Sequence, residues 1–245
     1  MKLEVGYQTD PGPRKGKNQD SVSVMVGEAL EDAAVLILSD GMGGARAGEV
    51  ASQEAVSVVE RHLSAPLPTA ADARERLLNA VQAANRTIFQ QAEASAEKHG
   101  MGCTIVAALV LGDQFWVASV GDSRAYLIRG GRAFQLTDDH TWVNARVRDG
   151  VMTREEASRS SLRHVLDRAL GTRPTVDVDI WYGESLIPGD VLLLCSDGLY
   201  GVLSDEEMVA TATTHPAQDA AERLIQQALD AHTHDNVSVV LLRVP

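Results

Sequence analysis

The chain has 245 residues, a formal net charge of −12 and 44% hydrophobic residues. Nucleic acid or an anionic membrane surface as the main partner would require clustered Lys and Arg, so the acidic balance argues against both. No apolar run reaches the roughly 18 residues of a membrane span, and the opening "MKLEVGYQTD" lacks the apolar core of a signal peptide, so we expect a cytoplasmic protein.

Short apolar runs alternate with turn residues along the chain, and this pattern predicts strands. In chain order the predicted strands cover residues 21–26, 34–39, 104–111, 114–120, 125–129, 133–136, 191–195 and 236–243. Gly112 with Asp113, and Gly130 with Gly131, each join two neighbouring runs. Because these residues accept positive φ angles, they favour tight hairpins between antiparallel strands.

Helical periodicity predicts four helices. They cover residues 49–63, 70–98, 205–213 and 216–232. Ser204 with Glu207, and Thr153 with Glu156, have the spacing of capping boxes, which mark helix starts. Antiparallel strands combined with long amphipathic helices predict an α+β fold in which helices cover sheets. No linker divides the chain, so we expect residues 1–245 to form one domain.

The stretch "LILSDGMGGARAGEVASQEAV", residues 37–57, places Asp40 between an apolar run and a glycine-rich turn. Neither common nucleotide fingerprint fits it. The dinucleotide pattern has Arg46 where a glycine is needed, and the P-loop pattern has Glu49 where a lysine should contact phosphate. One interpretation is that Asp40 binds a hard cation such as Mg²⁺ or Mn²⁺, and the alternative is that it caps the turn.

Four more aspartates lie beside predicted strands, namely Asp20, Asp122, Asp197 and Asp235. Asp40 and Asp197 share the order apolar run, Ser, Asp, Gly, as expected if two central strands deliver carboxylates side by side. Taken singly, Asp122 and Asp235 are typical of turns. If all five converge, their mutual repulsion makes a bound metal the simplest explanation.

The complete set of motifs resembles the metal-dependent, type 2C-like serine/threonine protein phosphatases in their compact bacterial form. In order, the motifs are "GPRKGKNQDS", "SDGMGGARAGEVAS", "MGCT", "GDSRAY", "LTDDHTW", the segment from "GVMTREEA" to "LDRALG", "LLLCSDGL" and "DNVSVV". They cover nearly the whole chain. The resemblance implies a four-layer α-β-β-α sandwich of two antiparallel sheets flanked by helices, with a variable flap at about residues 137–170.

The resemblance also implies a pair of Mn²⁺ or Mg²⁺ ions. Asp40 would bridge both ions, the backbone carbonyl of Gly41 would bind one, and Asp197 and Asp235 would hold the other. Two cations roughly 3.5 to 4 Å apart lower the pKa of a shared water, which can then attack phosphorus directly.

The same resemblance implies roles for further positions, including those that would hold the substrate phosphate. Asp20 would act through metal-bound water, and Asp122 with Asp197 would hold a third, weaker ion. Lys15 stands where the family has a phosphate-binding arginine, and Arg14 is beside it, so either residue could hold the substrate phosphate.

The residue that protonates the leaving group is not evident. Met42 and Ala45 occupy the positions where members of the family carry histidines. Protonation would therefore come from metal-bound water or from another residue such as His140.

The implied activity is hydrolysis of phosphoserine and phosphothreonine in proteins, with a serine/threonine kinase among the expected substrates and a monomeric enzyme. A cysteine-dependent phosphatase needs a cysteine, five residues and then an arginine. Counting from Cys195, the position of that arginine is Gly201, so this class of enzyme is excluded. The alternative within the same fold is a non-catalytic member that binds phosphoproteins or regulates a partner. Such a member should have lost a metal aspartate, and the presence of all five favours catalysis.

Overall fold

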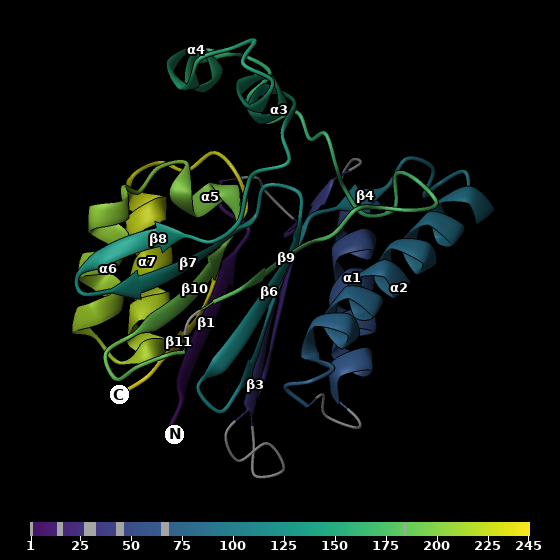
Figure 1. The fold of residues 1–245 in the computed structure, drawn as a ribbon. Coiled ribbons are helices and arrows are strands. Elements are labelled where there is room, and N and C mark those ends of the chain that lie inside the picture. Colours follow the sequence, from purple (N-terminus) through teal and green to yellow (C-terminus); the bar gives the residue numbers. More distant parts are fainter. Residues whose placement is uncertain (1, 14–16, 27–32, 43–46, 65–68, 184) are drawn as a thin grey trace.

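The computed structural model describes residues 2–13, 17–26, 33–42, 47–64, 69–183 and 185–245. Two antiparallel sheets lie at its centre (Figure 1). The five-stranded sheet has the order β1 (Glu4–Asp10), β11 (Val237–Arg243), β10 (Val191–Cys195), β7 (Arg124–Arg129), β8 (Arg132–Gln135). The six-stranded sheet has the order β2 (Asp20–Met25), β3 (Ala33–Met42), β5 (Ile105–Leu111), β6 (Gln114–Val120), β9 (Asp179–Tyr182), with β4 (Gly102–Cys103) also paired to β3.

Alternate residues of β3 serve two different cores, because successive side chains of a strand point to opposite faces. Leu36 and Leu38 pack between the two sheets, in a core that includes Leu194 of β10. Val35 and Ile37 point the other way, into a core shared with helices. Both faces of β3 are therefore apolar, and the strand reads as a continuous hydrophobic run.

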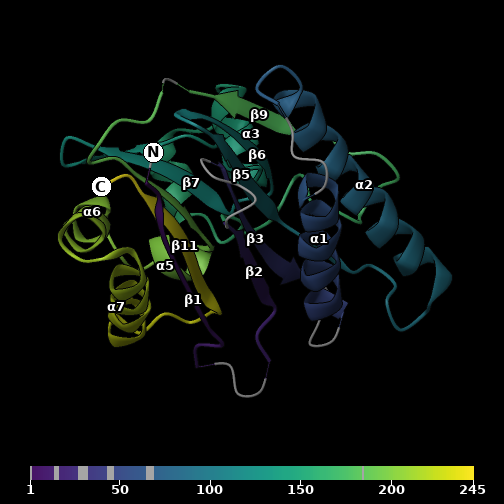
Figure 2. The ribbon, with the colours of Figure 1, turned by 90° about the horizontal axis from the view of Figure 1, so that it is seen from below.

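Helices cover the outer faces of both sheets, as Figure 2 shows from below for the pairs α1 with α2 and α6 with α7. The helices over the six-stranded sheet are α1 (Ala47–Ser64) and α2 (Ala73–Ala94). The helices packed on the five-stranded sheet are α5 (Asp197–Tyr200), α6 (Asp205–Thr214) and α7 (Ala217–Asp230). The predicted α-β-β-α sandwich is thus confirmed.

A segment with two short helices, α3 (Trp142–Arg148) and α4 (Arg154–Arg159), projects beyond one end of the sandwich (Figure 1). The capping box of Thr153 and Glu156 is present at the start of α4. Isolated bridges tie the base of the segment to itself and to the body, pairing Thr141 with Leu166 and Cys103 with Leu170.

Most of the predicted elements agree with the structure, and some differ. All eight predicted strands are present, and the two glycine turns join β5 to β6 and β7 to β8 as antiparallel pairs. The sequence analysis missed β1, β4, β9, α3 and α5. It also extended α2 too far, because the backbone of Ser95 is already extended and ends the helix. None of the helices in the described residues is long and apolar enough to cross a lipid bilayer.

The edge strand β1 pairs with β11 along its whole length, from Glu4 opposite Arg243 to Asp10 opposite Val237. Asp20 and Asp40 are likewise directly opposite each other at one end of the β2–β3 ladder. These registers determine which strand ends meet at the end of the sandwich that carries the aspartates.

Candidate metal centre

Asp20 and Asp40 come from the six-stranded sheet. Asp20 is the first residue of β2, Asp40 lies near the end of β3, and the two are antiparallel partners. Asp20 is buried, and burial with the charges of Asp197 and Asp235 raises its pKa to about 7. The two carboxylates therefore lie together at one edge of the inter-sheet core.

Asp197 and Asp235 come from the five-stranded sheet. Asp197 follows β10 and begins α5, while Asp235 precedes β11. Because β10 and β11 are antiparallel neighbours, the end of one strand lies beside the start of the other. The same sheet end therefore carries both carboxylates.

Asp122 lies in the turn between β6 and β7, where the chain crosses from one sheet to the other. It is 6% exposed, and burial followed by the charges of Asp197 and Asp139 raises its pKa to about 7. At Asp40, burial and then the charges of the other four aspartates raise the pKa well above its usual range. All five carboxylates thus interact electrostatically.

Two oxygen atoms of this group fit a cation. Asp20 Oδ1 and Asp197 Oδ1 are buried and have no hydrogen-bond partner among the described residues. Buried polar atoms without partners are costly, and a divalent cation would satisfy them. Within the described ranges, no three His, Cys, Asp or Glu side chains meet closely enough to form a ready-made metal site, so bound ions would have to draw the carboxylates together. The oxygen ligands suit Mn²⁺ or Mg²⁺.

The glycine after each of two aspartates lets another backbone approach closely. A Cβ atom at Gly41 would overlap the backbone carbonyl of Gly48 at the start of α1. A Cβ atom at Gly198 would overlap the backbone carbonyl of Asn236, next to Asp235. The repeated Ser-Asp-Gly order therefore reflects close packing behind each carboxylate as well as its chemistry.

Thr104 fixes the backbone of Asp40 and was missed in the sequence analysis. Its Oγ1 accepts a hydrogen bond from the Asp40 N–H at 2.9 Å, and its own N–H donates to the Asp40 carbonyl at 2.8 Å. The same Oγ1 lies 2.7 Å from Ser123 Oγ, beside Asp122. One buried hydroxyl thus links the turn that carries Asp122 to the strand that carries Asp40. The motif "MGCT" was its only signal.

Ser196 orients Asp20 from the opposite sheet. Its hydroxyl donates to Asp20 Oδ2 at 2.8 Å and accepts from the N–H of Ser238 at 3.0 Å. One carboxylate oxygen of Asp20 is thereby fixed by protein, whereas Oδ1 has no partner among the described residues. The signal for Ser196 in the sequence is its place in the Ser-Asp-Gly order that Asp40 and Asp197 share.

Asn236 anchors the chain that leads to Asp20. Its Oδ1 accepts from the N–H of Gln19 at 2.8 Å, and its Nδ2 donates to the carbonyls of Pro11 at 2.8 Å and Lys17 at 3.3 Å. These contacts hold both ends of the segment that contains the predicted phosphate-binding residues. Those two residues, Arg14 and Lys15, lie outside the described residues, as does Ala45.

His140 has a structural position rather than a catalytic one. Its side chain is fully buried, Nδ1 accepts from the Gly121 N–H at 3.1 Å, and Nε2 lies 3.1 Å from Asp179 Oδ2. Burial and the nearby Arg168 lower its pKa. With both ring nitrogens engaged, His140 fixes the base of the projecting segment and has no free atom for proton transfer.

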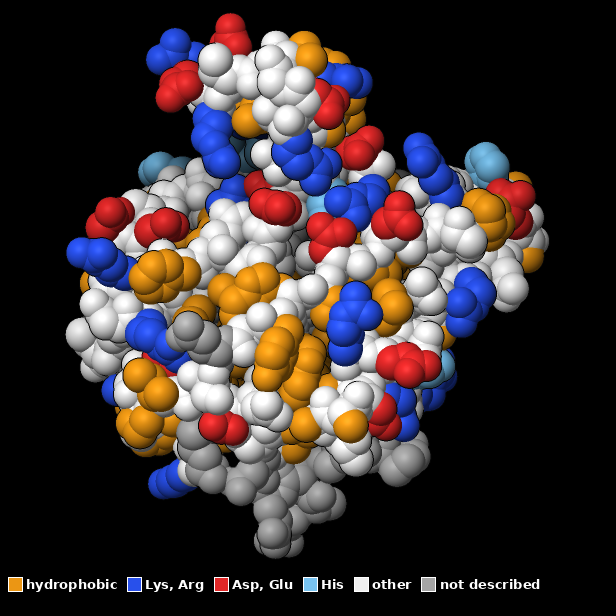
Figure 3. Space-filling model, in the orientation of Figure 1, with side chains coloured by type: hydrophobic (Ala, Val, Ile, Leu, Met, Phe, Trp, Pro, Cys, Tyr) orange, Lys and Arg blue, Asp and Glu red, His pale blue; other side chains and the backbone are white. Residues whose placement is uncertain are grey.

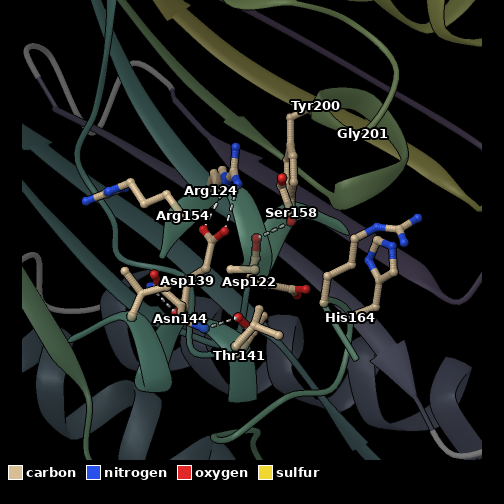
Figure 4. A pocket seen from close by; sticks show the side chains of 14 residues that line it. Asp122, Arg124, Asp139, Thr141, Asn144, Arg154, Ser158, His164, Tyr200 and Gly201 are labelled. Carbon is tan, nitrogen blue, oxygen red and sulfur yellow. Dashed lines mark hydrogen bonds and ion pairs between the residues drawn. The ribbon is translucent and has the colours of Figure 1, made fainter. Parts of the chain in front are cut away.

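His164 lies closer to the carboxylates and was missed, because an isolated histidine in "SLRHVL" carries no motif. Its Nδ1 is 3.5 Å from Asp197 Oδ2, and the side chain is 55% exposed. The contact with Asp197 raises the pKa of His164. Figure 4 shows it at the edge of the pocket that Asp122 lines.

Comparison with known proteins agrees with this geometry. The family model for "Protein phosphatase 2C" matches residues 14–234. The chain belongs to the protein phosphatase 2C family. It is therefore a metal-dependent protein serine/threonine phosphatase, and the family uses Mn²⁺ or Mg²⁺.

Three relatives illustrate how far the likeness extends. Serine/threonine phosphatase stp of Listeria monocytogenes is 34% identical over 98% of this chain and 95% of its own length. The serine/threonine phosphatase of S. agalactiae has 32% identity and a TM-score of 0.92, with 100% of both chains covered. The catalytic domain of the phosphatase PstP, solved with two manganese ions, has 36% identity and a TM-score of 0.83 over 99% of both chains.

Proposed function

We propose that the phosphatase hydrolyses phosphoserine and phosphothreonine in proteins at the end of the sandwich where the five aspartates gather. In this proposal Asp40 would contribute to holding both of two Mn²⁺ or Mg²⁺ ions, the Gly41 carbonyl would help to hold one, and Asp197 and Asp235 would hold the other. The observation that supports it most is the pair of buried, unpartnered oxygen atoms, one on Asp20 and one on Asp197.

The bound ions would supply the Lewis acidity that lowers the pKa of the attacking water and neutralises phosphoryl oxygens. The residues of the chain do the positioning. Thr104 fixes the backbone of Asp40, and Ser196 holds one oxygen of Asp20 so that the other can orient water. Asp122, together with Asp197, is assigned to a third and weaker ion.

The substrate phosphate is assigned to Arg14 or Lys15. The support for this assignment is the anchoring by Asn236, which holds the chain on both sides of these residues next to Asp20. A guanidinium or ammonium group there would complement the charge of a phosphoryl group.

We further propose that residues 1–245 form one phosphatase domain with a flap at about residues 137–170. The expected substrates include a serine/threonine kinase, and the enzyme is expected to act as a cytoplasmic monomer. Size-exclusion chromatography with light scattering tests the oligomeric state, and a purified phosphorylated kinase domain tests the substrate.

The decisive experiment compares Asp40→Asn with Asp113→Asn, which makes the same charge change in the exposed turn between β5 and β6. With Mn²⁺ and a phosphothreonine peptide, we expect Asp40→Asn to lower kcat by at least about a hundredfold, because the nucleophile depends on the paired ions. Asp113→Asn should match the wild type. Full wild-type activity in excess chelator, or a normal kcat for Asp40→Asn, would refute the assignment.

A further inference from the structure

A pocket of about 410 Å³ lies between the projecting segment and the body of the phosphatase. Asp122 and Tyr200 line it from the body, while Thr141, Arg154 and His164 line it from the projecting segment (Figure 4). Because Asp122 belongs to the group of five carboxylates, the pocket opens directly beside the proposed reaction site.

One ion pair in this pocket is already complete. Arg124 Nε and Nη2 donate to the two carboxylate oxygens of Asp139 at 2.9 and 2.7 Å. The Arg124 guanidinium also stacks over the Tyr200 ring, 3.6 Å from its centre. Because these two charges neutralise each other, the other charged residues of the lining determine the net charge of the pocket.

Two further arginines, Arg154 and Arg163, line the same pocket. In the described part of the chain, neither guanidinium has a hydrogen-bond or ion-pair partner. Figure 3 shows positively charged side chains, drawn in blue, where the projecting segment meets the body. Two guanidinium groups that line a pocket without a hydrogen-bond or ion-pair partner among the described residues can pair with an anion that a substrate supplies.

A second pocket, of about 550 Å³, continues the first one. The two share Arg124, Asp139, Asn144, Val147 and Arg154 in their lining, and the second extends to Gln135 at the end of β8. Arg154 thus lines both pockets. Together they offer a path along which an extended peptide could run past Arg154 and reach Asp122 at one end.

We propose that this pocket binds an anionic side chain of the substrate that lies near the phosphorylated residue in the sequence. Arg154, supported by Arg163, would pair with a carboxylate or with a second phosphate. The phosphatase would therefore prefer phosphorylated segments that carry another negative charge within a few residues. This inference rests on the proposed function, because it names the class of substrate for that same site.

The kinetic test uses phosphothreonine peptides that differ at one position. One set places a glutamate in turn at each of the three positions before and after the phosphothreonine, a second set places phosphoserine there, and the control has alanine. We expect the wild type to prefer an anionic neighbour in at least one position, and Arg154→Ala to lower kcat/KM for that peptide by about tenfold, with no change on the alanine peptide or p-nitrophenyl phosphate.

Arg159→Ala is the matched control, because Arg159 lies in the same helix and carries the same charge but does not line the pocket. It should retain the wild-type preference. Comparison of the glutamate and phosphoserine sets identifies which anion the pocket favours. Equal rates on anionic and neutral peptides for the wild type, or an equal loss on both for Arg154→Ala, would overturn the proposal.

A binding measurement separates this inference from the proposed function. With excess chelator preventing turnover, fluorescence anisotropy of the labelled peptides should show tighter binding of the anionic peptide to the wild type but not to Arg154→Ala. If no peptide is hydrolysed with Mn²⁺, the proposed function fails, whereas the anisotropy result still decides whether the pocket binds an anion. No difference in affinity between the peptides would overturn the inference even in an active enzyme.

Discussion

At the scale of single residues, two buried asparagines make the same kind of contacts with two different loops. Asn236 accepts one backbone N–H and donates to two backbone carbonyls in the chain before Asp20. Asn85 of α2 does the same at the return of the projecting segment, where it accepts from the Gly171 N–H and donates to the carbonyls of Arg173 and Pro174. Each amide therefore replaces secondary structure where a loop must have a defined shape.

This pairing supports a prediction about substrate binding. Asn236→Ala and Asn85→Ala should each lower the free energy of unfolding by about 2 kcal/mol or more, because each leaves buried backbone groups unpaired. Only Asn236→Ala should also raise KM for p-nitrophenyl phosphate, since it releases the segment that carries Arg14 and Lys15. Denaturant unfolding and steady-state kinetics of the two variants provide the measurements. An equal rise of KM in both would contradict the assignment of the phosphate site.

At the scale of elements, the two capping boxes have the same chemistry but different surroundings. Ser204 and Glu207 start α6, which buries Met208, Thr211 and Ala212. Thr153 and Glu156 start α4, in which Ala157 is the buried residue. Helix α6 is therefore part of a hydrophobic core, whereas α4 has few packing contacts that would stabilise it.

We therefore expect the same substitution to act differently in the two helices. Ser204→Ala should lower the global free energy of unfolding by about 1 kcal/mol, as is usual for a lost N-cap. Thr153→Ala should leave global unfolding unchanged but speed hydrogen exchange in α4, because a weakly packed segment opens locally. Thermal denaturation and hydrogen-exchange mass spectrometry distinguish the two effects. A large drop in Tm for Thr153→Ala would mean that α4 belongs to the cooperative core.

The elements that could be predicted are those with strong internal patterns. The run around Leu36 is apolar on both faces because it serves two cores, and the glycine turns and capping boxes carry their own local signals. By contrast, β1 and β9 are edge strands with few buried residues, β4 has two residues, and α5 has a single turn, so packing rather than periodicity determines them. Sequence reasoning identified the aspartates but not the roles of Thr104, Ser196 or Asn236. These residues lie inside the motifs, but a motif does not show which distant backbone group a side chain contacts.

At the scale of the whole molecule, the candidate metal centre joins the two sheets. Asp20 and Asp40 belong to one sheet, Asp197 and Asp235 flank strands of the other, and Asp122 lies in the connection between them. Ions that bind all of these carboxylates would contribute to stability as well as to catalysis, because a ligand that binds only the folded state stabilises it.

Metal should therefore raise Tm independently of activity. At a Mn²⁺ concentration of about one hundred times Kd, we expect the free energy of unfolding to rise by about 2.7 kcal/mol, which corresponds to several degrees in Tm. Asp40→Asn should lose most of this response, whereas Asp113→Asn should retain it. Differential scanning calorimetry with chelator and with Mn²⁺ measures the shift. The same metal-dependent shift in both variants would place the ions elsewhere.

The register between β1 and β11 has a mechanical consequence. Because Glu4 lies opposite Arg243 and Asp10 lies opposite Val237, tension applied to the two strands at the Glu4 end would break the ladder one pair at a time toward Asp235. In such an unzipping geometry each hydrogen bond bears the load alone, so the outer strand should peel at low force. The carboxylates, at the far end of the ladder, would be the last part of it to feel the pull.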